Sequence, residues 1–159
     1  RTAWLDSGLR DSPLAATYSY NLVDHEDGVD DNQGGSAAAI TAYAVSSEFD
    51  LDDGHKYMFV SRVIPDISFD GSTADNPVAT LTLSPLANPG AGYNSPTSTG
   101  GVNNATVTRT ATSPVEVFTE QLDIRVRGRQ LSMRIESAAT GVTWQLGTPR
   151  LDMRPDGRR

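Results

Sequence analysis

The segment Leu122-Asp-Ile-Arg-Val-Arg-Gly-Arg-Gln-Leu-Ser-Met-Arg-Ile-Glu136 decides the fold class. Apolar and polar residues alternate on both sides of Gly128-Arg129, which is the pattern of strands that bury one face. A two-residue turn there brings six apolar side chains onto one face of a hairpin: Leu122, Ile124, Val126, Leu131, Met133 and Ile135. The same register sets Asp123 opposite Arg134 on the other face. The sequence therefore predicts an antiparallel hairpin over residues 122–135.

Several other stretches have the composition of short strands between turns. The predicted strands are residues 37–45, 56–64, 78–84, 142–146 and 151–153. The second follows a turn at residues 50–54 and ends at Pro65. Trp144 is expected to point inward, in a strand that extends the hairpin to a meander. Residues 86–104, rich in Gly, Pro, Ser, Thr and Asn, predict a long loop or interaction arm.

The fold class that follows is all-β, an antiparallel β-sandwich or sheet cluster built from meanders and hairpins with long loops. A chain of 159 residues is long enough for one core. We expect an N-terminal extension and acidic loop over residues 1–36, and a β-rich structural domain over residues 37–159. Because the chain opens on Arg1 in what reads as a strand already under way, we expect a piece of a longer protein.

Composition excludes some classes and charge suggests a kind of partner. The chain has no Cys, which excludes a disulfide scaffold and thiolate chemistry, and no apolar run approaches the roughly 20 residues that cross a bilayer. The net charge is −7, yet residues 101–159 carry nine Arg and six acids. Such asymmetry favours head-to-tail packing between like subunits, although two unrelated solvated faces would give the same count.

Neither catalysis nor a metal or other cofactor is expected. No nucleophile-bearing motif such as G-x-S-x-G is present, and nothing predicts an apolar pocket around the carboxylates. The acidic stretches 24–31 and 50–54 supply oxygen ligands for Ca²⁺ but lack the spacing of a calcium loop. His55 is interpreted as a turn residue rather than a ligand.

Arginines near the C-terminus are the candidate subunit interface. They are Arg125, Arg127, Arg129, Arg134, Arg150, Arg154, Arg158 and Arg159. Nucleic acid would also attract them, but the acidic balance and the lack of interleaved aromatic residues favour protein partners. The last four are expected to matter more for assembly than for folding.

Two parts of the sequence carry a resemblance to a known family. They are Ile124-Arg-Val-Arg-Gly-Arg-Gln-Leu-Ser-Met-Arg-Ile-Glu-Ser137 with Gly141-Val-Thr-Trp-Gln-Leu-Gly-Thr-Pro-Arg-Leu-Asp-Met-Arg-Pro-Asp-Gly-Arg-Arg159, and Phe49-Asp-Leu-Asp-Asp-Gly-His-Lys-Tyr-Met-Phe-Val-Ser-Arg-Val-Ile-Pro-Asp66. Over residues 20–159 the chain resembles the C-terminal region of tail structural proteins, of the stabilisation or nozzle type, from short-tailed marine bacteriophages.

The resemblance implies a virion structural protein located in the phage tail. It further implies a homo-oligomeric ring that packs against neighbouring virion proteins, and it offers no catalytic residue to carry over. No membrane partner is expected, because no apolar run is long enough to cross a bilayer. Two alternatives stay open. One is a carbohydrate-binding β-sandwich for host recognition, which would expose Trp and Tyr on a flat face. The other is a calcium-dependent adhesin domain, which rests on the acidic loops alone.

Overall fold

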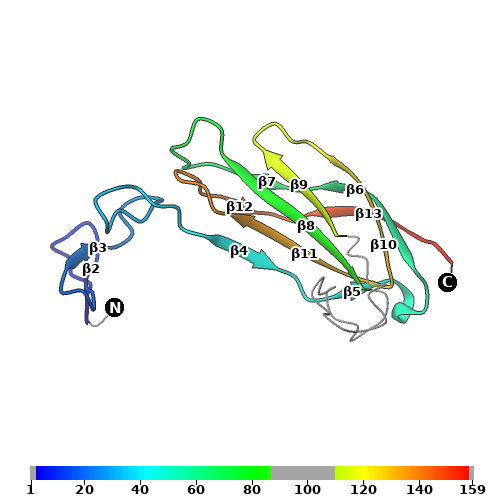
Figure 1. Ribbon diagram of the computed structural model, residues 1–159, viewed down its shortest axis with the longest axis horizontal. Coiled ribbons are helices and arrows are strands. Elements are labelled where there is room, and N and C mark those ends of the chain that lie inside the picture. The colour runs from blue at the N-terminus through cyan, green and yellow to red at the C-terminus, as the bar shows by residue number, and fades with distance from the viewer. Residues whose placement is uncertain (1–2, 87–109, 158–159) are drawn as a thin grey trace, which may run out of the picture.

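The computed structural model describes residues 3–86 and 110–157, and these residues are all-β apart from one short 3₁₀ turn at Asp52–Gly54 (Figure 1). The strands are β1 (Ala3–Leu5), β2 (Leu14–Ala16), β3 (Leu22–Asp24), β4 (Ala42–Val45), β5 (Phe49–Asp50), β6 (Met58–Ile64), β7 (Ile67–Ser68), β8 (Val78–Leu86), β9 (Ala111–Glu116), β10 (Leu122–Gly128), β11 (Gln130–Ser137), β12 (Gln145–Leu146) and β13 (Arg150–Pro155). The predicted fold class is confirmed.

Two antiparallel sheets face each other in a sandwich. One has the order β4-β11-β8-β9, with β5 continuing the β4 edge of β11. The other has the order β10-β6-β13. The short pair β7-β12 prolongs the pairing of β6 with β13 beyond a break at Pro65 and Asp66. Alternating residues of both sheets point inward and form one hydrophobic core between two outer faces.

The core draws its largest buried side chains from both sheets. They are Met58, Val60, Val63, Leu81, Leu83, Val115, Val126, Leu131 and Ile135, each at most 1% exposed. Trp144 is partly buried against this cluster, and its indole Nε1–H donates a hydrogen bond to the Oγ of buried Ser137, 3.1 Å away. The inward position predicted for Trp144 is therefore right.

The predicted hairpin over residues 122–135 is wrong in its pairing. β10 pairs with β6 in one sheet, whereas β11 pairs with β8, β4 and β5 in the other. Asp123 consequently lies opposite Arg62, and Arg134 lies opposite Thr82 and Val45. The six apolar residues still face one core, because β10 and β11 lie on opposite sides of it. Alternation specifies which face of a strand is buried, but it does not determine which strand pairs with it.

Gly128 and Arg129 carry the chain from one sheet to the other. Gly128 does not have the positive φ that a two-residue hairpin turn of type II′ would require at its first position. The N–H of Arg129 instead donates to the carbonyl of Leu86 at 2.9 Å, which ties the crossing to the end of β8. Glycine is needed there for space, since an added Cβ would lie 2.9 Å from Pro85 Cβ.

The remaining predictions along the chain meet different outcomes. The strands over 56–64, 78–84 and 151–153 are confirmed as β6, β8 and β13, and the turn at 50–54 is confirmed as well. In 37–45 only residues 42–45 form a strand, and in 142–146 only residues 145 and 146 do. The C-terminal meander is wrong, because β12 pairs with β7 rather than β11. Most of the long loop over 86–104 lies outside the described residues.

The first three strands form a separate small sheet. β1-β2-β3 is a meander of three-residue strands, and Figure 1 shows it beyond one end of the sandwich, away from the end where β13 finishes. Residues 25–41 connect it to β4 and contain an isolated bridge between Asp31 and Ala38. One tether to the sandwich is the Gly141 N–H, which donates to Asp30 Oδ1 at 2.7 Å.

Candidate interaction surface

The outer face of the β10-β6-β13 sheet gathers arginines from all three strands. We call it the arginine face; it consists of Arg62, Arg125, Arg127, Arg150 and Arg154 together with Phe59 and Ile64. Side chains alternate along a strand, so the residues that follow and precede core residues point to the outer face. The same alternation that builds the core therefore turns these side chains outward. Four of these arginines are exposed, and Arg127 is half-buried.

Cross-strand rows organise this face. In one row Asp123 and Asp152 lie on either side of Arg62, and Arg62 Nη2 is 3.6 Å from Asp152 Oδ2. In the other row Arg127 and Arg154 lie on either side of Phe59. The guanidinium of Arg154 stacks on the Phe59 ring, with its Cζ 4.9 Å from the ring centre. The result is a half-buried aromatic centre among cationic side chains.

One end of the arginine face is fixed by Tyr57. The Cζ atoms of Arg127 and Arg129 lie 4.1 and 5.0 Å from the Tyr57 ring centre. Arg127 also forms an ion pair with the Asp156 carboxylate through Nε, and its Nη2 donates to the Asp156 carbonyl at 3.0 Å. Cation–π contact and ion pairing together hold the Arg127 side chain against its own chain. Arg127 therefore also connects β10 to Tyr57 and Asp156 within its own chain.

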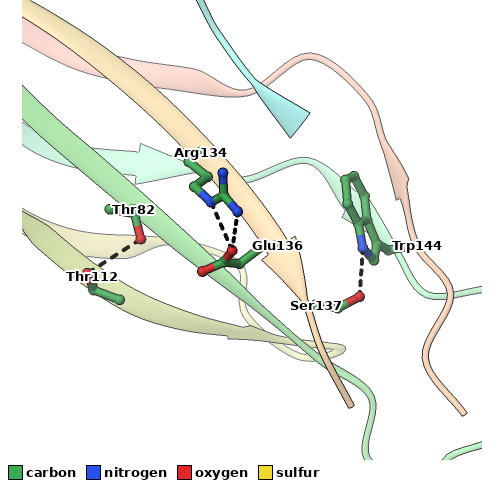
Figure 2. A network of polar contacts seen from close by, with 6 residues as sticks. All are labelled: Thr82, Thr112, Arg134, Glu136, Ser137 and Trp144. Carbon is green, nitrogen blue, oxygen red and sulfur yellow. Dashed lines mark hydrogen bonds and ion pairs between the residues drawn. The ribbon is translucent and has the colours of Figure 1, made fainter. Parts of the chain in front are cut away.

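Arg134 lies on the opposite side of the sandwich. Its Nε and Nη2 atoms donate to Glu136 Oε2 at 2.8 and 2.6 Å, on the outer face of β11 (Figure 2). Its guanidinium also covers the ring of Tyr43, 4.2 Å from the ring centre. On the neighbouring strands the hydroxyls of Thr82 and Thr112 are 3.4 Å apart. On this second outer face Arg134 and Glu136 are paired with each other.

The structure thus divides the predicted arginine set. Arg125, Arg127, Arg150 and Arg154 share one face, Arg129 sits at its end, and Arg134 is on the other sheet. Arg158 and Arg159 lie outside the described residues. Sequence reasoning missed Arg62 and Phe59, which occupy the central strand of the face. The alternation of apolar and polar residues within residues 56–64 could have indicated that Phe59 and Arg62 point outward. A break in the strand register near Ser61 interrupts that alternation.

The N-terminal sheet presents a second candidate surface, which is apolar. Its register places Leu5 beside Leu14, and Ala3 and Ala16 beside Leu22, all on one face. We call this the leucine face. Leu5 is 55% exposed and Leu22 is 75% exposed, so water covers side chains that strands of this kind normally bury. On the opposite face Trp4 rests against His25, with ring centres 4.7 Å apart.

The acidic loop after β3 uses several of its carboxylates in hydrogen bonds. Asp24 Oδ1 accepts from Arg10 Nη2 at 3.0 Å, and Asp31 Oδ1 accepts from the N–H of Gln33 at 2.9 Å. Within the described residues no group of three or more His, Asp or Glu side chains is arranged to hold a metal ion. The same part of the chain contains no helix long and apolar enough to span a bilayer.

Comparison with known proteins adds no relative. Neither a scan against protein-family models nor a search of curated proteins finds a match.

Proposed function

We propose that this chain is a virion structural module, a tail component of a short-tailed bacteriophage that acts by packing against copies of itself in a ring and against neighbouring virion proteins. The observation that carries the proposal is the arginine face. It gathers positive charge on a molecule whose net charge is −7, and protein interfaces are enriched in arginine and aromatic residues. The resemblance of residues 20–159 to tail proteins supplies the biological setting.

The construction of the face suits a mechanical role. Arg125, Arg150 and Arg154 project from sheet strands rather than loops, so the core of the sandwich holds their backbone in place. Ion pairs at Asp152 and Asp156 leave the face with both signs of charge, in a fixed order. Such a pattern favours one docking orientation over others, because misplaced like charges repel. Specific packing is what a ring component requires.

The aromatic side chains of the sandwich at Trp144 and Tyr43 give the carbohydrate-binding alternative less support, whereas Trp4, Tyr18 and Tyr20 of the N-terminal segment are exposed. A sugar platform needs an exposed aromatic ring on a flat face, and the Trp144 indole is partly buried with its N–H bound to Ser137. Tyr43 is exposed on the outer face of the larger sheet, but Arg134 covers one side of its ring. A glycan-binding screen on the full chain checks this alternative, and a specific sugar ligand would favour it over the structural proposal.

Sedimentation velocity on the full chain tests the structural proposal. We expect concentration-dependent association of the unmodified chain, and weaker association when Arg125→Gln and Arg150→Gln are combined. The matched control is Arg134→Gln, on the opposite face. Arg125 and Arg150 are exposed, and exposed substitutions change stability by less than about 0.5 kcal/mol, so the double variant should melt close to the unmodified chain. Arg134→Gln loses the contacts with Glu136 and Tyr43, so its association is measured below its own melting temperature. A chain that stays monomeric at about 100 µM, or equal losses in both variants, would contradict the proposal.

A further inference from the structure

The leucine face of the N-terminal sheet is incomplete as it stands. Three strands of three residues each form a stable sheet only when an apolar face is packed against something. Within β1, β2 and β3, Ala15 is the single buried residue, while Leu5 and Leu22 face water. Exposed apolar side chains gathered on one face of a sheet indicate an interaction site.

Charge indicates what covers the leucine face. In residues 3–36 the chain carries seven Asp or Glu and one Arg, so the N-terminal sheet and its following loop are strongly acidic. Asp24 lies on the leucine face itself, in the row that contains Leu5 and Leu14, and is ion-paired with Arg10. The surface therefore combines exposed leucines with a segment of net negative charge. Its complement is a surface that combines apolar side chains with net positive charge.

The arginine face has that composition. Phe59 and Ile64 lie on its central strand, and arginines of β10 and β13 lie on both sides. Arginine stems add further apolar area beneath their charged ends. In Figure 1 the N-terminal sheet stands beyond the end of the sandwich opposite to that where β13 finishes, so its position suits a neighbour better than its own sandwich.

We propose that the leucine face of one copy docks on the arginine face of a second copy. Because the two surfaces differ, the contact is heterologous, and repetition of such a contact generates a closed ring or an open filament. The inference rests on the proposed function, since it names the surfaces through which the ring would form. It assigns the N-terminal sheet as an arm rather than as part of the fold of its own sandwich.

The test compares two variants by sedimentation velocity on the full chain. Leu5→Ser combined with Leu22→Ser removes apolar area from the leucine face, and we expect at least about a tenfold rise in the dissociation constant between copies. The matched control is Leu9→Ser, in the same N-terminal segment, where Leu9 is 97% exposed and lies outside the strands. It should leave association unchanged.

A cross-link checks the contact in chains that keep the leucine face nearly intact. The chain has no Cys, so Leu22→Cys in one preparation and Arg154→Cys in another can be mixed and treated with a short bismaleimide. A covalent heterodimer is expected from this mixture. It is not expected when Thr82→Cys, on the outer face of the other sheet, replaces Arg154→Cys.

The outcomes separate the two proposals. Association that survives the paired leucine substitutions, or a cross-link that forms equally well to Thr82→Cys, overturns the docking and leaves the proposed function standing. An unmodified chain that remains monomeric overturns both. If the paired substitutions unfold the chain, as near-ultraviolet circular dichroism would show, the cross-link alone decides the matter.

Discussion

Gly128 stands where the chain leaves one sheet for the other, and space there is scarce. A Cβ at this residue would lie 2.8 Å from the Gln130 carbonyl oxygen and 2.9 Å from Pro85 Cβ. Both neighbours belong to or adjoin sheet strands and cannot move freely. We therefore expect Gly128→Ala to lower the free energy of unfolding by about 1–3 kcal/mol, as overpacking does elsewhere. Urea unfolding measures the change.

The control is Gly34→Ala, because nothing lies within 4 Å of a Cβ at Gly34 and its φ is not positive. It should stay within about 0.5 kcal/mol of the unmodified chain. If Gly128→Ala is equally harmless, the close approach at the sheet crossing does not exist in solution.

Arg127 provides a second prediction at the scale of the residue. Its guanidinium stacks on Tyr57 and pairs with Asp156, and so it connects β10 to the last residues of the described chain. We expect Arg127→Ala to lower stability by about 1–2 kcal/mol, the sum of a cation–π contact and a partly exposed ion pair. Thermal or urea unfolding measures the loss.

Arg125→Ala is the comparison, since Arg125 is an exposed neighbour on the same strand and face. Its removal should change stability by less than about 0.5 kcal/mol. Equal effects of the two substitutions would show that the contacts of Arg127 contribute nothing beyond those of any surface arginine.

At the scale of the strand, alternation predicted faces correctly and neighbours wrongly. Ile124 and Met133 both face the core, as expected, yet they belong to strands in different sheets. A two-residue connection serves a hairpin or a crossing between sheets equally well, and only the rest of the chain decides. Here β10 pairs with β6 and β11 pairs with β8, so the two strands belong to different sheets.

Engineered cysteines distinguish the two pairings, because the chain has none of its own. Asp123 lies opposite Arg62 in the structure, whereas the hairpin register would place it opposite Arg134. We expect Asp123→Cys to form a disulfide with Arg62→Cys under mild oxidation, since directly opposed strand residues have Cα atoms about 4.5–5.5 Å apart. Mass spectrometry after proteolysis detects the bond.

The matched variant keeps Asp123→Cys and adds Arg134→Cys. These residues are on opposite outer faces of the sandwich, so no intramolecular disulfide should appear. A disulfide formed in this variant and not in the other would support the hairpin pairing and contradict the assignment of β10 and β11 to two sheets.

For the whole molecule, composition and periodicity were enough to predict the fold class but not the residues of the arginine face. Strand alternation gave the outward direction of Arg125 and Arg127. Placing Arg150 and Arg154 beside them required the pairing of β13 with β6, which joins residues far apart in sequence. Arg134 was grouped with them because the predicted hairpin set it on the same outer face, whereas β10 and β11 belong to different sheets. Long-range pairing is the information that a single sequence does not display.

The acidic loops lead to a prediction about metal removal. The described residues offer no group of three acidic or histidine side chains fit to hold an ion, and Asp30 and Asp31 accept hydrogen bonds from backbone N–H groups instead. We expect the melting temperature with excess EDTA to stay within about two degrees of that with added Ca²⁺. A large drop with EDTA would favour the calcium-dependent adhesin.

Salt dependence tests whether charge contributes to association of the whole molecule. An acidic N-terminal segment and an arginine face attract each other over a distance set by ionic strength, and the screening length falls from about 10 Å at 0.1 M salt to about 3 Å at 1 M. The apolar centres of the two surfaces are little affected by screening. We therefore expect association to weaken, without disappearing, when NaCl is raised from about 0.05 to about 0.5 M. Sedimentation velocity follows the dissociation constant.

The chain with Arg125→Gln and Arg150→Gln serves as the comparison in the same titration. It has lost part of the positive charge of the arginine face, so its association should be weaker at low salt and should depend less steeply on NaCl. The melting temperature should vary little with salt in either chain, because the ion pairs within the sandwich are partly exposed. Association that strengthens with salt would instead indicate an interface governed by apolar contact alone, in which the arginine face has no part.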